Sequence, residues 1–206
     1  MMELLDYMEA YNMLKKNGVH AIDAKYVENA NDAIRFSRGE PIVLKVISQK
    51  AMHKTKSGLV ALGLERPEEI RSSFSSLYKK AQTIKPYKIL AQKMVKNGIE
   101  IIIGGNTDRQ FGKFVLLGLG GIYVETFKDF AMRSCPINRY DARSMVEQLR
   151  SKKIIAPDEK SEQLLIGLLL KVSKFFASEK SITELDLNPV ILHGNTYSAV
   201  DLRLIR

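Results

Sequence analysis

Three oxygen-bearing side chains interrupt an apolar segment near the C-terminus, ELDLNPVILHGNTYSAVDLRLI. Asp186, Asn188 and Asp201 occupy positions where the interior of a sheet would favour Leu, Val or Ile. Two carboxylates and an amide oxygen are suitable ligands for a hard divalent cation. Mg²⁺ fits best, with substrate phosphates as further ligands. The alternative is a solvated strand face that carries polar residues. The choice depends on how the chain places the three side chains.

The segment has the composition of a β-hairpin. Gly194–Asn195 suits a two-residue primed turn, which makes Asn188 face Asp201 and Asp186 face Arg203. Because side chains alternate across a strand, the three candidate ligands then share one face, with Cβ atoms roughly 5 to 8 Å apart. The other face is expected to join the core through Leu185, Leu187, Ile191, Val200, Leu202 and Leu204.

A basic loop, KAMHKTKSG, follows the strand-like run PIVLKVIS. It places His53 among Lys50, Lys54 and Lys56 and ends in Gly58, which gives a positive surface for phosphoryl oxygens. A neutral imidazole can also accept a phosphoryl group near neutral pH. The alternative is an exposed basic hairpin tip.

Three further charged residues stand in or next to apolar runs. Lys45 lies within PIVLKVIS and Glu100 within GIEIII, where a charge needs a partner or a solvated face. Lys45 could also reach into a cleft toward an anion. Arg133, after KDFAM, could clamp a phosphate or form a surface ion pair.

Composition limits the classes of protein that fit. The 206 residues suffice for one large domain or two small lobes. The single cysteine, Cys135, excludes an intrachain disulfide and favours a reducing, cytoplasmic setting. The start of the chain lacks the features of a signal peptide, and the aliphatic run LLIGLLL is too short to span a bilayer. The net charge of +9 favours anionic partners, but no interleaved aromatic and basic platform supports nucleic acid.

Helices and strands are intermixed along the chain, with hairpins in each half, so the sequence predicts an α+β protein of two lobes that meet near residues 89–94. A polar connector is expected over 151–162. The predicted helices cover 4–17, 29–38, 66–84, 138–149 and 162–176, and the predicted strands before the hairpin include 21–27, 41–48, 59–65 and 88–95.

The order of these motifs resembles the ATP-grasp subunit of ADP-forming acyl-CoA (acetate–CoA) ligases. The runs DRQFG, GLGGIYVE and ELDLNPV carry the resemblance most specifically, and the last is similar to the nucleotide-binding subunit of succinyl-CoA synthetase. The resemblance implies an ATP-grasp fold whose lobes hold the nucleotide between them. Residues 1–91 would form the lobe with the mobile phosphate loop, and residues 92–206 the lobe with the metal-binding hairpin.

The resemblance also assigns roles to individual positions. Asp186, Asn188 and Asp201 match the family's Mg²⁺ ligands, and Lys45 matches the strand lysine that touches nucleotide phosphates. Gln92, Met94 and Val95 match the hinge that meets adenine, Glu100 a position near the ribose, Arg133 a phosphate-facing arginine, and His53 the histidine that relays phosphate.

The implied overall reaction is acyl-CoA + ADP + phosphate ⇌ acid + CoA + ATP. The implied cofactors are ATP or ADP and Mg²⁺, and the implied partner is an α-type, CoA-binding subunit that carries the acyl chemistry. The loop around His53 departs from the family pattern, because Lys56 replaces an Asp and Leu59 replaces a Gly. A nucleotide-binding regulatory partner without catalysis is therefore the alternative.

Overall fold

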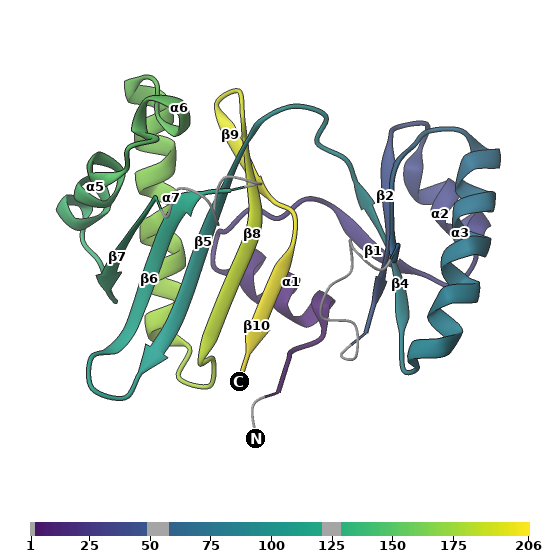
Figure 1. Ribbon diagram of the computed structural model, residues 1–206, viewed down its shortest axis with the longest axis horizontal. Helices are drawn as coiled ribbons and strands as arrows, with labels where there is room; N and C mark the ends of the chain where they lie inside the picture. The colour runs from purple at the N-terminus through teal and green to yellow at the C-terminus, as the bar shows by residue number, and fades with distance from the viewer. Residues whose placement is uncertain (1–2, 49–57, 121–128) are drawn as a thin grey trace. The chain divides into compact units, whose positions relative to one another are not determined.

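The computed structural model of the chain describes residues 3–48, 58–120 and 129–206 (Figure 1). The chain divides into two compact units. Unit 1 consists of Met1–Ala21 and Asn97–Arg206, and unit 2 consists of Ile22–Lys96. Each unit combines helices with an antiparallel sheet, as expected for an α+β protein.

Unit 2 is built on a four-stranded sheet in the order β1-β4-β2-β3. The strands are β1 (Ala24–Val27), β2 (Ile42–Ile47), β3 (Val60–Leu64) and β4 (Lys88–Lys93), and the helices are α2 (Ala30–Ser37), α3 (Pro67–Ala81) and the short 3₁₀ helix η1 (Gln82–Ile84). Both α-helices lie on one face of the sheet (Figure 1). Their apolar sides meet Leu44, Val46 and Ile89 of the strands, and this contact forms the core of the unit.

The helices of unit 2 begin and end where the sequence supplies suitable residues. Asn29 caps α2 by accepting a hydrogen bond from the backbone of Asp32. Pro67 occupies the first turn of α3, where its missing N–H costs nothing. At the other end of α2, Arg38 adopts a left-handed backbone conformation with φ 49° and ψ 33°.

Unit 1 is built on a larger sheet in the order β10-β8-β5-β6-β7, with β9 paired to β8. Its strands are β5 (Ile99–Asp108), β6 (Gly112–Leu119), β7 (Phe130–Ser134), β8 (Glu184–His193), β9 (Thr196–Ala199) and β10 (Leu202–Ile205). Its helices are α1 (Tyr7–Lys16), α5 (Arg139–Gln148), α6 (Lys152–Ile155) and α7 (Glu159–Ser178). Helix α7 packs against the sheet so closely that a Cβ on Gly105 of β5 would lie 2.9 Å from the Phe176 ring.

The N-terminal segment belongs to unit 1 because its backbone joins the last strand of the chain. The backbone N–H of Glu3 donates to the Arg206 carbonyl at 2.8 Å, and that of Leu5 donates to the Leu204 carbonyl at 2.9 Å. The two compact units therefore do not coincide with a single division of the chain between residues 91 and 92. The division at 91/92 was predicted for the ATP-grasp lobes, and it stays a prediction. The expectation of a polar connector over 151–162 was wrong, because α6 and the start of α7 lie there.

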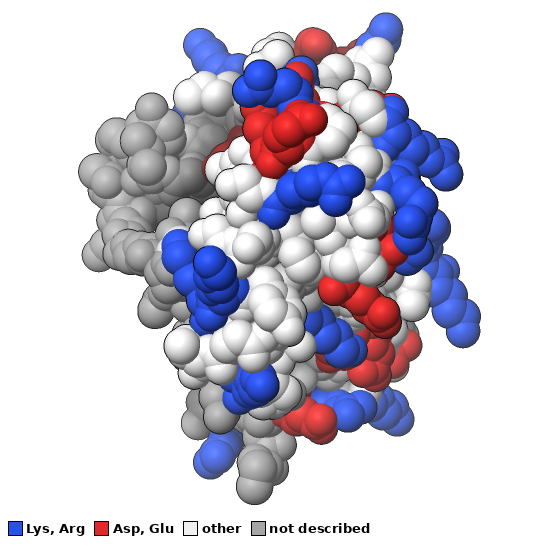
Figure 2. Space-filling model, turned by 90° about the vertical axis from the view of Figure 1, so that its right-hand side faces the viewer, with Lys and Arg blue, Asp and Glu red and all other residues white. Residues whose placement is uncertain are grey.

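Charges are mixed on the face of the molecule that carries α2 and α3. Figure 2 shows both signs of charge on this face, with Asp and Glu between the Lys and Arg over much of it and several Lys and Arg adjoining along the right-hand edge of the view. Within the described ranges, no helix combines the length and apolar character needed to cross a membrane.

Candidate functional site

The hairpin pairs in the register that its turn predicts. His193 faces Thr196 next to the turn, and Asp186 faces Arg203 farther along. Between these points the backbone N–H of Asn188 donates to the Asp201 carbonyl at 3.2 Å. The backbone therefore brings the three candidate metal ligands to one place on the hairpin.

The hairpin is irregular at this place. The Asn188–Pro189 peptide is cis, and the register between β8 and β5 shifts there. Because of this bulge, Leu187 before it and Val190 after it are both buried, although an unbroken alternation would put them on opposite faces. The prediction that Ile191 and Val200 are core residues was therefore wrong, since both are only partly buried.

The electrostatics of the hairpin favour a cation. Burial raises the pKa of Asp186, the nearby Asp201 carboxylate raises it further, and Arg203 opposes the change. The two carboxylates are thus close enough to repel each other. Among the described residues the Asp186 carboxylate accepts no hydrogen bond, whereas Asp201 Oδ1 accepts one from the Leu202 N–H at 3.2 Å.

The donor set fits Mg²⁺ that is only partly coordinated by protein. The described part of the chain contains no cluster of three or more His, Cys, Asp or Glu side chains placed to hold a metal. Asp186, Asn188 and Asp201 instead offer two carboxylates and one amide oxygen. Mg²⁺ accepts such a set because it usually keeps several waters and binds substrate phosphates as well.

Unit 2 carries a second group of predicted site residues on the sheet face away from α2 and α3. Val43 faces Gln92 and Lys45 faces Leu90 across β2 and β4, so Lys45 and Gln92 are diagonal neighbours on one face, roughly 7 to 8 Å apart. Both are buried, with 7% and 0% of their surface exposed. Lys88 shares this face by the same alternation, and its ammonium lies 4.6 Å from the Tyr26 ring centroid.

Lys88 is a cation that our reading of the sequence missed. The alternation Lys88, Leu90, Gln92 along the strand could have revealed it. The predicted hinge residues Met94 and Val95 come directly after β4 and are partly buried. The Met94 N–H donates to the Pro41 carbonyl at 3.1 Å, which fixes the start of the hinge segment.

Glu100 lies near the start of β5, faces Ile191 of β8 and is exposed. Its carbonyl accepts a hydrogen bond of 2.7 Å from the N–H of Gly120. A Cβ on Gly120 would lie within 3.0 Å of Glu100 atoms, so only glycine permits this close approach. The backbone around Glu100 is therefore well fixed, while its carboxylate is accessible.

Arg133 is not brought together with the metal-ligand candidates. It lies on β7, and β6 and β5 separate it from β8, a distance of about 14 Å between strands. The strand register pairs Arg133 through β6 and β5 with Leu185 of β8, so Arg133 lies on the face of the sheet opposite to Asp186. Its guanidinium donates to Ser144 Oγ at 3.0 Å and Gln148 Oε1 at 3.2 Å, so it ties β7 to α5.

The basic loop lies outside the described residues, which omit 49–57. The predicted roles of His53, Lys50, Lys54 and Lys56 therefore stay predictions.

Comparison with known proteins gives the family. A family model described as an ATP-grasp domain matches residues 2–205. The chain belongs to the ATP-grasp family. This confirms the predicted family and the predicted ATP-grasp fold.

Curated relatives of this ATP-grasp chain include ligase subunits. It is 32% identical over 207 residues to the β subunit of acetate–CoA ligase (ADP-forming) I from Pyrococcus furiosus, and the match covers 96% of this chain and 89% of the relative. It is 34% identical to acetate–CoA ligase (ADP-forming) I from Archaeoglobus fulgidus, where the match covers 98% of this chain but 30% of the longer relative.

A solved structure shares the fold with a TM-score of 0.84 and 30% identity, covering 98% of this chain and 92% of the other. It is a dinucleotide-forming acetyl-coenzyme A synthetase from Ca. Korarchaeum cryptofilum in complex with coenzyme A and Mg-AMPPCP. In that protein the phosphohistidine segment points towards the nucleotide-binding site.

Proposed function

We propose that this chain is the nucleotide-binding β-type subunit of an ADP-forming acyl-CoA ligase. Its reaction is phosphoryl exchange between a phosphohistidine and ADP or ATP, within acyl-CoA + ADP + phosphate ⇌ acid + CoA + ATP. The observation that carries the proposal is the gathering of Asp186, Asn188 and Asp201 at the bulge of β8, in a chain that matches a ligase β subunit over 96% of its length.

The residues of the chain suit this chemistry. Phosphoryl transfer passes through a loose transition state, so the protein contributes mainly position and charge. Asp186, Asn188 and Asp201 would hold Mg²⁺, which neutralises phosphate charge when it is bound. Lys45, on the β2 face that also carries Gln92, would contact the phosphates, and Gln92, Met94 and Val95 would receive adenine. The complex of the archaeal synthetase with Mg-AMPPCP supports ATP or ADP with Mg²⁺ as the cofactors.

Two further assignments complete the proposal. Glu100 would contact the ribose, and His53 would relay phosphate. Arg133 stays a predicted phosphate contact that its bonds to α5 do not support. The acyl and CoA chemistry would belong to an α-type partner subunit, and the longer Archaeoglobus relative supports this, because our chain corresponds to 30% of it. A cytoplasmic location is part of the same proposal.

Calorimetry of Mg-ADP binding tests the nucleotide site. The double variant Asp186→Ala/Asp201→Ala should lose Mg²⁺-dependent ADP binding, because only the Asn188 amide would remain to hold the metal. Glu147→Gln is the control, since it removes an exposed carboxylate on α5. Unchanged affinity in the double variant would contradict the proposal.

The alternative function, a regulatory nucleotide-binding partner without catalysis, is favoured by Lys56 and Leu59 in the loop around His53. Mixing the chain with an α-type subunit and measuring acyl-CoA-dependent ATP synthesis separates the two functions. Turnover that disappears in a His53→Asn variant supports the catalytic subunit, and absent turnover with intact Mg-ADP binding supports the regulatory one.

A further inference from the structure

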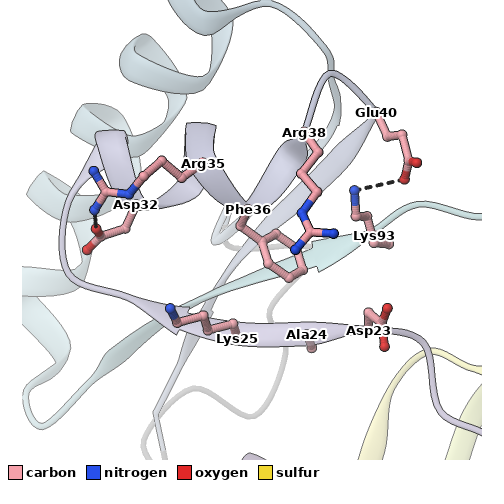
Figure 3. A pocket seen from close by; sticks show the side chains of 9 residues that line it. All are labelled: Asp23, Ala24, Lys25, Asp32, Arg35, Phe36, Arg38, Glu40 and Lys93. Carbon is pink, nitrogen blue, oxygen red and sulfur yellow. Dashed lines mark hydrogen bonds and ion pairs between the residues drawn. The ribbon is translucent and has the colours of Figure 1, made fainter.

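Unit 2 contains a polar cavity of about 600 Å³ between β1 and α2 (Figure 3). Lys25 of β1 and Lys93 of β4 line it, and both belong to the sheet face that carries the helices. The predicted nucleotide residues Lys45 and Gln92 belong to the opposite face. The cavity is therefore a separate feature from the proposed nucleotide site.

Two of the acidic side chains that line the cavity are already engaged. Asp32 accepts hydrogen bonds from the Glu28 N–H and the Asn29 amide and pairs with Arg35. Glu40 pairs with Lys93 at 2.8 Å, and the pKa of the Glu40 carboxyl is lowered by its hydrogen bond to Lys93 and by the lysine charge. These pairs leave little negative charge free to repel an anion.

Two cations of the cavity remain without such a partner. Neither Lys25 nor Arg38 forms a hydrogen bond or ion pair with another described residue, although the Arg38 charge helps to lower the pKa of the Glu40 carboxyl, and both cations are exposed. Asp23 is the remaining exposed acid on the wall. With the engaged pairs set aside, the cavity offers two positive charges against one negative charge.

The backbone of Arg38 gives an independent reason to look at this residue. Among the described residues it is the one non-glycine residue with positive φ, and Gly39 beside it has φ 78°. This left-handed conformation is easy for Gly and acceptable for Asn, but unfavourable for Arg. Figure 3 shows the result: the Arg38 side chain projects from the end of α2 toward β1, beside the Phe36 ring.

We propose that this cavity binds a small phosphate-bearing metabolite, whose phosphate Arg38 binds directly and Lys25 reaches by turning its side chain, since Figure 3 draws the Lys25 ammonium pointing away from Arg38. A guanidinium and an ammonium together suit a phosphate dianion, since charge-assisted hydrogen bonds are strong and directional. The volume lies in the range of small-molecule sites, and a free phosphate would leave most of it empty. The cavity therefore fits a phosphate ester, whose organic part would lie against Phe36.

An NMR titration of the full chain tests this site, with inorganic phosphate and phenyl phosphate as separate probes. We expect saturable shifts at the amides of Ala24 and Gly39, with tighter binding of phenyl phosphate. Equal binding of the two probes would assign the site to free phosphate instead of an ester. Absence of shifts at these amides with both probes would overturn the proposal.

Arg38→Asn is the decisive variant, because Asn accepts the left-handed conformation while the positive charge is lost. It should bind phenyl phosphate about tenfold more weakly or worse, with an unchanged or higher melting temperature. Lys25→Gln should weaken binding as well. Arg71→Gln is the matched control, since Arg71 is an exposed arginine on α3 away from the cavity. Parent affinity in Arg38→Asn and in Lys25→Gln would refute the assignment of these two cations. No nucleotide is used, so the result is independent of the proposed ligase function.

Discussion

Replacing Asp186 with Asn should separate metal binding from stability. The pKa of Asp186 is raised by burial and by Asp201, so its charged form is disfavoured in the folded chain. A carboxyl with a raised folded pKa contributes stability that is present at low pH and lost as pH rises through that pKa. Above the acidic range, the raised pKa of Asp186 therefore makes the folded chain less stable than it would be without this shift. Asp186→Asn removes this charge and keeps the shape of the side chain, so the ligand-free variant should be as stable as the parent or more so.

Mg-ADP should stabilise the parent much more than it stabilises Asp186→Asn. A ligand that binds only the folded state at 100 times its dissociation constant adds about 2.7 kcal/mol of stability. For a chain of 206 residues, each kcal/mol of added stability raises the melting temperature by about 2 to 4 °C. Saturating Mg-ADP should therefore raise the melting temperature of the parent by roughly 5 to 10 °C. Asp186→Asn lacks one of the two carboxylates and should lose most of this gain.

Thermal unfolding with and without Mg-ADP measures both effects, and Glu147→Gln again serves as control. The advantage of Asp186→Asn over the parent in the absence of ligand should be larger at neutral pH than at acidic pH. A ligand-free variant that melts several degrees below the parent would mean that the Asp186 charge stabilises the fold. A full Mg-ADP shift in the variant would show that Asp186 does not hold the metal.

Three further predictions concern the packing of unit 1, and thermal unfolding measures each of them. Gly105→Ala should destabilise the fold by about 1–3 kcal/mol, because its Cβ would meet Phe176 at 2.9 Å. Gly167→Ala within α7 has free space and should stabilise the fold by about 0.5–1 kcal/mol. A Gly105→Ala variant that is more stable than Gly167→Ala would contradict this packing. Lys113→Met should lower the stability of the fold by about 1–2 kcal/mol, because the Lys113 ammonium donates hydrogen bonds of 2.7 and 2.6 Å to two carbonyls at the end of α7. An unchanged melting temperature would mean that these hydrogen bonds do not stabilise the fold. Arg133→Met should lower stability by about 1 kcal/mol, because it loses the hydrogen bonds of Arg133 to α5. It should leave the affinity for Mg-ADP unchanged. A large loss of Mg-ADP affinity would instead support the predicted contact of Arg133 with phosphate.

The hairpin shows how far the sequence predicts this site. The turn at Gly194–Asn195 is a local signal, so the pairing of Asp186 with Arg203 could be predicted from it. The bulge at Asn188 could not, because it arises in the pairing of β8 with β5, a strand distant in sequence. The bulge changes which side chains are buried but leaves the three ligand candidates together.

Other differences have the same origin in long-range contacts. The strand pattern of PIVLKVIS left Lys45 either on a solvated strand face or reaching into a cleft, and the structure shows it buried, with Gln92 on the same face through the register of β2 with β4. Nothing in the local sequence around Arg133 indicates that two strands separate β7 from β8, or that α5 supplies its partners. The backbone hydrogen bonds between Glu3 and Arg206 likewise join the two ends of the chain, so neither end alone could predict them.

Anomalous diffraction from crystals grown with Mn²⁺ and an ADP analogue would test the central claim most directly. We predict one Mn²⁺ peak bonded to oxygens of Asp186, Asn188 and Asp201 and to the nucleotide phosphates, at roughly 2.1 to 2.2 Å. Nucleotide bound in the crystal with its metal away from all three side chains would contradict the account.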